Sequence, residues 1–91
     1  MYNKQEYVYT NLTTGSTSQI FSGKGILHAI NVNQSTSTII ALYDGIGTTT
    51  TAIGSLKASI GEGHYEFDVV VANGLYITYA TGGDYTVIYT K

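Results

Sequence analysis

Several residue types are missing from this chain. Its 91 residues contain no cysteine, no proline and no tryptophan, and its four basic residues are all lysines. Without cysteine the protein has no disulfide and no thiolate ligand for a metal. Folding a chain of this length buries only about 60–65% of its unfolded surface. We therefore expect one domain, residues 1–91, whose small core is completed by association with further copies of the chain.

Charge of either sign is also sparse. The four lysines stand against six carboxylates, for a net charge of −2. Phosphate-backbone binding requires a basic face, and arginine supplies its bidentate contacts, so we expect no nucleic-acid partner. No apolar h-region follows the first residues, and no stretch approaches the roughly 20 apolar residues of a membrane span. The expectation is therefore no signal peptide, no membrane partner and assembly in a cytoplasm.

Alternating apolar residues between glycine-containing turns predict an all-β chain. No window predicts an amphipathic helix. Short strands spaced by about 8–12 residues favour an antiparallel β-sandwich, and eight of them suggest a jelly roll. An immunoglobulin-like sandwich is the alternative, since periodicity does not give strand order. The predicted strands cover residues 5–12, 17–22, 25–33, 37–43, 52–57, 64–72, 75–80 and 85–90.

Two of these segments carry more specific expectations. The apolar run Ile39–Leu42 is typical of a strand covered on both sides. Asn73-Gly74 is the sequence that a type I′ turn prefers, because both central residues of that turn have positive φ. We therefore expect the sixth and seventh strands to be antiparallel neighbours.

One group of side chains resembles a metal site. His64, Glu66 and Asp68 fall on one side of a predicted strand, where they offer an imidazole and two carboxylates. Polar residues are the ordinary occupants of that side when the other side is apolar. No second histidine or cysteine lies at zinc-ligand spacing. We expect no metal and no cofactor, and we keep these three residues as weak metal candidates, within the hypothesis of a metal-assisted hydrolase.

The remaining features do not indicate an enzyme. His28 is predicted to lie with Ile26, Ile30 and Val32 on an apolar strand face, where an interior or interface histidine is more common than a general base. No serine stands in a G-x-S-x-G elbow. The glycine pairs near Lys24 and Ile46 are followed by turns or strands rather than by the helix that a phosphate loop needs. The sequence therefore predicts no catalytic residues.

Tyrosine is the abundant aromatic residue, with nine copies against two phenylalanines. Its ring buries well at subunit interfaces while its hydroxyl stays paired. Sugars also stack on such rings, so a carbohydrate-binding module using Tyr76 or Tyr79 is the alternative function. The absence of tryptophan makes it the weaker hypothesis. The interface candidates are Tyr7, Tyr9, His28, Tyr76, Tyr79 and Tyr89.

A series of short motifs occurs in a fixed order along nearly the whole chain. After Tyr9–Thr14 come G-x-G-I-L-H at Gly23–His28, L-Y-D-G at Leu42–Gly45, N-G-L at Asn73–Leu75 and the closing strand Tyr85–Tyr89. In this order they resemble small proteins that tailed phages and prophages encode among their virion genes. Members of that set commonly end in arginine, where this chain has Lys91.

The resemblance implies a compact β-sandwich virion component. It would be a capsid decoration or head-fibre element, or a tail-associated subunit, and often a trimer. Its partners would be its own copies and the major capsid protein or another virion protein, with surface glycans as a further partner in the carbohydrate-binding alternative. No catalytic residues are known to us for such proteins, so the resemblance implies none here.

Overall fold

A computed structural model describes residues 7–47 and 51–91. The described chain forms eight strands, close to the eight predicted segments. The first two residues of the predicted first strand lie outside the described ranges. Among the described residues, no helix is long and apolar enough to cross a membrane. The strands are β1 (Val8–Leu12), β2 (Thr17–Ser22), β3 (Gly25–Gln34), β4 (Ile40–Asp44), β5 (Thr51–Leu56), β6 (Gly63–Val71), β7 (Gly74–Thr78) and β8 (Asp84–Thr90).

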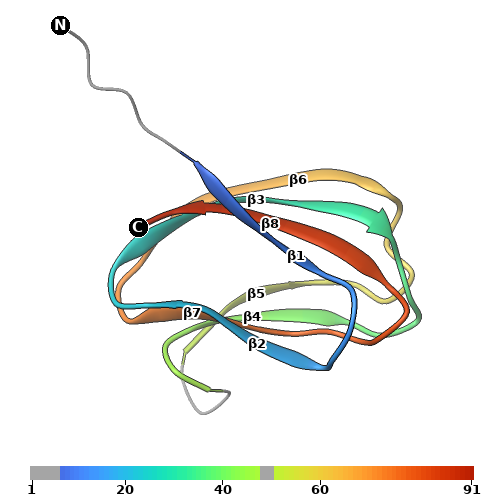
Figure 1. Ribbon diagram of the computed structural model, residues 1–91, viewed down its shortest axis with the longest axis horizontal. Helices are drawn as coiled ribbons and strands as arrows, with labels where there is room; N and C mark the ends of the chain where they lie inside the picture. Colours follow the sequence, from blue (N-terminus) through green and yellow to red (C-terminus); the bar gives the residue numbers. More distant parts are fainter. Residues whose placement is uncertain (1–6, 48–50) are drawn as a thin grey trace, which may run out of the picture.

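The strands lie in two four-stranded antiparallel sheets that face each other (Figure 1). Their orders are β1-β8-β3-β6 and β2-β7-β4-β5. Four pairs, β1 with β8, β2 with β7, β3 with β6 and β4 with β5, are those of one long hairpin whose tip is β4-β5. The pairs β3-β8 and β4-β7 complete the two sheets. This is the wrapped hairpin of a jelly roll, so the jelly-roll prediction is confirmed over the immunoglobulin-like alternative.

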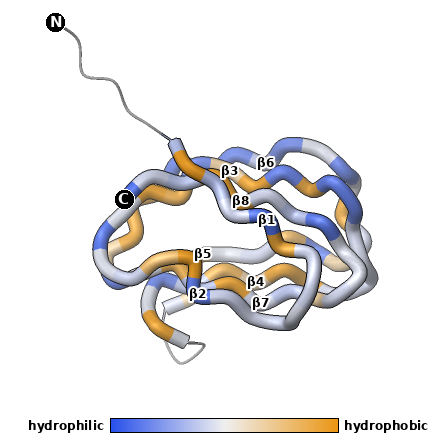
Figure 2. The backbone as a smooth tube through the Cα atoms, viewed as in Figure 1, coloured by the Kyte–Doolittle hydropathy of each residue, from blue (hydrophilic) through white to orange (hydrophobic). Residues whose placement is uncertain are grey.

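The core lies between the two sheets. Hydrophobic and hydrophilic residues alternate along many of the strands (Figure 2), as period-two burial requires. Phe21 and Tyr89 stack across the core with ring centroids 5.3 Å apart. Within the described ranges no polar or charged residue is buried. The buried cluster comprises Leu12, Phe21, Leu27, Ile30, Val32, Ile40, Leu42, Leu56, Val71, Leu75, Ile77, Tyr79, Tyr85, Val87 and Tyr89.

The expectation that Ile39–Leu42 would be covered on both sides was wrong. Ile40 and Leu42 are buried, whereas Ala41 is half-buried and Ile39 is 52% exposed. β4 therefore has one core face only. A jelly roll has two layers, so the far side of each sheet faces outward and no strand is sandwiched by a third layer.

The prediction that the sixth and seventh strands pair with each other was also wrong. β6 pairs with β3, whereas β7 pairs with β2 and β4 in the other sheet. Gly74 has φ of 144°, but Asn73 is not among the residues with positive φ, so the turn is not type I′. Instead the Asp44 carboxylate accepts the N–H groups of Ala72 (3.1 Å) and Asn73 (2.8 Å). These bonds hold the segment as a corner that carries the chain from one sheet to the other.

Candidate functional site

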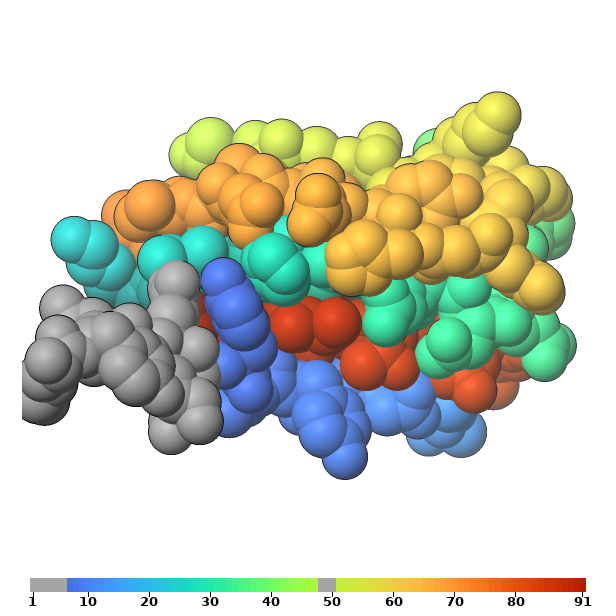
Figure 3. Space-filling model, turned by 90° about the horizontal axis from the view of Figure 1, so that it is seen from above, coloured from blue at the N-terminus to red at the C-terminus, as the bar shows by residue number. Residues whose placement is uncertain are grey.

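The outer face of the β1-β8-β3-β6 sheet carries the side chains best suited to bind an ion or another protein. Figure 3 looks onto this face, with β6, β3, β8 and β1 side by side. Strand register places polar and apolar side chains in rows across it. Both histidines, two of the carboxylates around them and several exposed apolar residues lie on this one surface.

A pair of bulges shapes the middle of this face. In β3, Leu27 pairs with Tyr89 and Ala29 with Ile88, so His28 is one extra residue relative to β8. In β6, Val69 pairs with Leu27 and Glu66 with Ala29, which leaves both Phe67 and Asp68 opposite His28. Such bulges bend a strand and redirect a side chain.

His28 lies on the outer face, not with Ile30 and Val32 as predicted. Those two residues and Leu27 are buried, whereas the His28 side chain is 22% exposed. The prediction assumed an uninterrupted period of two along the strand. The bulge at His28 adds a residue, and this reverses the alternation within β3.

Asp68 and Tyr7 hold the His28 ring. The Nδ1–H of His28 donates to Asp68 Oδ1 at 2.5 Å. Tyr7 stacks on the imidazole, with ring centroids 4.3 Å apart and planes 25° apart. Asp68 has φ of 50°, in the left-handed region that only it and Ser59 occupy among the described non-glycine residues. The carboxylate is thus directed at the histidine by an uncommon backbone conformation.

His64 lies beside this pair. It pairs in register with Asn31 of β3, and its Nδ1–H donates to Asn31 Oδ1. Its Nε2 is 3.9 Å from Glu66 Oε2, and its ring centroid is 6.4 Å from that of His28. One ligand atom each from His28, His64 and Glu66 lies within 4.8 Å of the other two.

The structure therefore rearranges the three predicted metal candidates. It keeps His64 and Glu66 together, but Asp68 bonds to His28. No second histidine lies near His64 in sequence, but His28 of the neighbouring strand β3 supplies one. Sequence reasoning missed it because strand pairing, not sequence distance, places His28 next to His64. The one available signal was that both histidines belong to predicted strands.

A polar network occupies the end of the same face where β8 begins. The side-chain amide of Asn11 donates to Asp84 Oδ1 at 2.7 Å, and that of Asn33 donates to the same oxygen at 3.2 Å. Both amides also donate to the Thr86 hydroxyl at 3.2 Å. The hydrogen bond from Asn11, and then that from Asn33, lowers the pKa of Asp84 below its ordinary value of 3.8. This network crosses β1, β8 and β3.

The opposite end of the face is apolar. Ile26 pairs with Val70 and with Thr90, and Tyr9 pairs with Ile88. Tyr9 is 71% and Val70 64% exposed, while Ile26 and Ile88 are half-buried. We call Tyr9, Ile26, Val70 and Ile88 the apolar patch.

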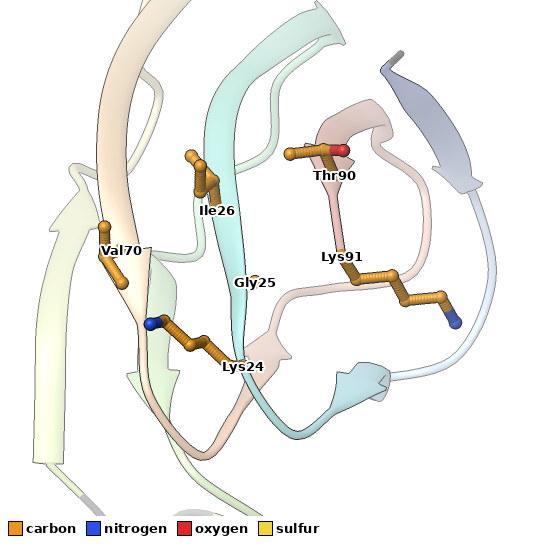
Figure 4. A pocket seen from close by; sticks show the side chains of 6 residues that line it. All are labelled: Lys24, Gly25, Ile26, Val70, Thr90 and Lys91. Atoms are coloured by element: carbon orange, nitrogen blue, oxygen red, sulfur yellow. The ribbon is translucent and has the colours of Figure 1, made fainter. Parts of the chain in front are cut away.

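An open pocket of about 450 Å³ lies at the edge of the apolar patch. Figure 4 shows its lining residues at the ends of β3, β6 and β8, with Lys24 turned toward β6 and Lys91 turned away from it. Apolar side chains of Ile26 and Val70 and two lysines therefore border the same hollow. None of the residues that line it is an aspartate or a glutamate.

The predicted tyrosines are divided between surface and core. Tyr79 and Tyr89 are buried, and their hydroxyls bond to the Thr14 carbonyl at 2.7 Å and the Thr10 hydroxyl at 3.0 Å. Neither ring is exposed at the surface of the chain, so Tyr79 cannot be the sugar-stacking residue of the carbohydrate-binding alternative. Tyr76 is half-buried on the outer face of the other sheet, tilted against Tyr43 at 6.3 Å.

The outer face of β1-β8-β3-β6 thus combines two features, a group of metal-ligating side chains and an apolar patch. The first is suited to holding an ion, and the second is suited to contact with another protein surface. Comparisons with protein-family models and with curated proteins find no match to this chain.

Proposed function

We propose that this chain is a non-enzymatic structural subunit of a bacteriophage virion, which assembles with its own copies and binds the particle lattice as a capsid decoration or head-associated protein. The β-sandwich expected from the motif resemblance and the strand order of a jelly roll support this function. The single observation that carries the proposal is the apolar patch. Particle assembly would take place in the host cytoplasm.

The apolar patch is unusual for a surface that contacts only water. Single exposed apolar residues are normal in soluble proteins. Here the four residues form two register pairs, Tyr9 with Ile88 and Ile26 with Val70, on four adjacent strands, and Tyr9 and Val70 are more than half exposed. Contiguous patches of this kind, with aromatic residues and a polar rim, are typical of protein–protein interfaces. In a chain with so small a core, burying this patch would contribute a sizeable part of the total stability.

A second copy of this chain is the occupant that the charges favour. Lys24 and Lys91 border the apolar end of the face, and Asp84 lies at its other end. A copy turned end for end would place these lysines near the partner's acidic end. A self-complementary contact of this type closes a two-fold dimer, whereas a trimer would join two different patches of each chain; opposite charges fix the register.

The test is the mass of the full chain in solution, measured by light scattering over a series of concentrations. We expect the wild type to be oligomeric, and the double variant Tyr9→Lys, Val70→Lys to be monomeric because each lysine would be buried without a partner. The matched control is Ile39→Lys, Ile46→Lys, which changes two exposed apolar residues elsewhere and should leave the mass unchanged. The same measurement shows whether the oligomer is the trimer that the resemblance implies.

Two results would contradict the proposal. A wild-type chain that stays monomeric at its highest soluble concentration would remove self-assembly. Absence of the chain from the mass spectrum of virions purified from the host that carries this gene would contradict a structural role in the virion. Circular dichroism of each variant shows that a change in mass does not come from unfolding.

A carbohydrate-binding attachment module is the second candidate. Tyr43 and Tyr76 present tilted rings on the outer face of β2-β7-β4-β5, and Thr17 pairs with Thr78 on the same sheet. Aromatic rings can stack on a sugar, and neighbouring hydroxyl groups can form hydrogen bonds with it. A glycan array with the wild type and with Tyr76→Ala separates this function from the first, because lattice binding needs no glycan.

A further inference from the structure

The group formed by His28, His64 and Glu66 has the donor atoms of a transition-metal site. Two imidazoles and one carboxylate form a set that binds Zn²⁺, whereas Ca²⁺ and Mg²⁺ prefer oxygen ligands alone. Three protein ligands with an open fourth position is also the arrangement of many zinc sites. The ligand atoms come from two neighbouring strands and lie within 4.8 Å of one another.

Hydrogen bonds prepare both imidazoles for a metal. Asp68 Oδ1 accepts the Nδ1–H of His28, and Asn31 Oδ1 accepts the Nδ1–H of His64. Because an oxygen acceptor occupies each Nδ1, the lone pair of each ring is at Nε2. A histidine that binds a metal almost always donates its other ring N–H to such an oxygen, which fixes the tautomer and the ring orientation.

The distances suit an ion better than a direct contact. His64 Nε2 and Glu66 Oε2 are 3.9 Å apart, too far for a hydrogen bond. Two ligands at about 2.0–2.1 Å from one tetrahedral ion are about 3.4 Å apart. The side chain of Glu66 is 62% exposed, so a rotation of its carboxylate can close the difference.

The backbone provides a second observation. Bulges in β3 and β6 meet at His28 and Asp68, and Asp68 adopts φ of 50°. The Asp68 side chain itself takes no part in core packing, because it is 58% exposed. Bulges and uncommon backbone conformations persist where they direct functional side chains. Here they aim a carboxylate at Nδ1 of His28.

We propose that His28, His64 and Glu66 bind one divalent transition-metal ion, with Zn²⁺ as the best fit, and that Asp68 and Asn31 orient the two imidazoles. The site is complete within one copy of the chain. It therefore does not rest on the proposed assembly, and each proposal can fail without the other.

The experiment titrates the untagged full chain with Zn²⁺ by calorimetry and with Co²⁺ by visible absorption. We expect one saturable ion per chain and a Co²⁺ spectrum of the tetrahedral type. His28→Ala and His64→Ala should each abolish saturable binding, and Glu66→Gln should weaken it. Asp68→Asn should lower the affinity about 10- to 100-fold, as loss of an orienting carboxylate does.

Glu62→Gln is the matched control, since Glu62 is an exposed glutamate close in sequence but outside the group. Its affinity should equal that of the wild type. Nitrogen NMR of the wild-type histidines provides a measurement that needs no variant, because Zn²⁺ should move the Nε2 signals of both rings. Absence of saturable binding, or binding that survives His28→Ala and His64→Ala, would overturn the proposal whatever the oligomeric state.

Discussion

Hydrogen bonds between side chains on the outer face of β1-β8-β3-β6 connect neighbouring strands of that sheet. Asp84 accepts amide hydrogens from Asn11 of β1 and Asn33 of β3. A carboxylate that accepts two such bonds is stabilised in its charged form, which lowers the pKa of Asp84 in the folded protein. Because the unfolded chain lacks these bonds, protonation of Asp84 favours unfolding.

The resulting prediction concerns stability at acid pH. The folded pKa of Asp84 lies below the unfolded value, so its contribution is complete above about pH 5 and is lost as pH falls through about 4 toward the folded pKa. We expect the double variant Asn11→Ala, Asn33→Ala to be less stable than the wild type at pH 7, and the difference to shrink as pH falls below about 4. Urea denaturation at a series of pH values measures both curves.

The variant Asp84→Asn provides the control, because it removes the titrating group while keeping a side chain of similar size. In that background the asparagine substitutions should cause a loss that does not vary with pH. A difference between wild type and double variant that stays constant from pH 7 to about pH 2 would show that Asp84 is not the group responsible.

Elements of the two sheets approach closely where β3 begins. A Cβ built on Gly25 would lie 2.7 Å from Cε1 and Cζ of the Phe21 ring and 2.8 Å from the Thr90 carbonyl oxygen. Phe21 is itself stacked on Tyr89 in the core. Glycine at this position therefore lets β2, β3 and β8 pack together at one end of the sandwich.

Gly25→Ala should consequently destabilise the protein by about 1–3 kcal/mol, the usual cost of overpacking a well-filled core. The matched control is Gly54→Ala in the edge strand β5, where a Cβ meets nothing within 4 Å. That substitution should change the free energy of unfolding by less than about 0.5 kcal/mol. Equal effects of the two substitutions in urea denaturation would mean that the close approach at Gly25 does not limit packing.

The whole molecule combines a small core with an exposed apolar patch. The proposed association would bury this patch in the folded state only, and it would then stabilise folding by mass action. We expect the thermal midpoint of the wild type to rise with protein concentration. The midpoint of Tyr9→Lys, Val70→Lys should not depend on concentration. Scanning calorimetry at several concentrations measures this, and a concentration-independent wild type would argue against association through the patch.

Much of this fold is local in origin and was predicted from the residues. Period-two alternation, as in Tyr85, Val87 and Tyr89, marks most strands, because a strand at a two-layer core buries the side chains of one face. The number of strands then favours the jelly roll. Strand limits differ mainly at ends, as at Ile40, where the exposed Ile39 extends the apolar run without being part of the strand.

The candidate site was predicted only in part. His64 and Glu66 were recognised, because they share one side of a clearly alternating strand. His28 was placed on the wrong face, since a bulge has no reliable signature in a single sequence. The corner at Asn73 was taken for a hairpin because its local preference is strong, and the Asp44 carboxylate that overrides it lies far away in sequence.

The sequence by itself determined the class of fold, the strands and the absence of a disulfide, because these depend on residue type and on spacing of a few residues. Only the tertiary structure decided that two histidines on neighbouring strands share one surface and that an apolar patch lies beside them. The physical reason is that strand pairing and bulges bring together side chains far apart in the chain. These long-range contacts, and not local preferences, determine which groups can act together.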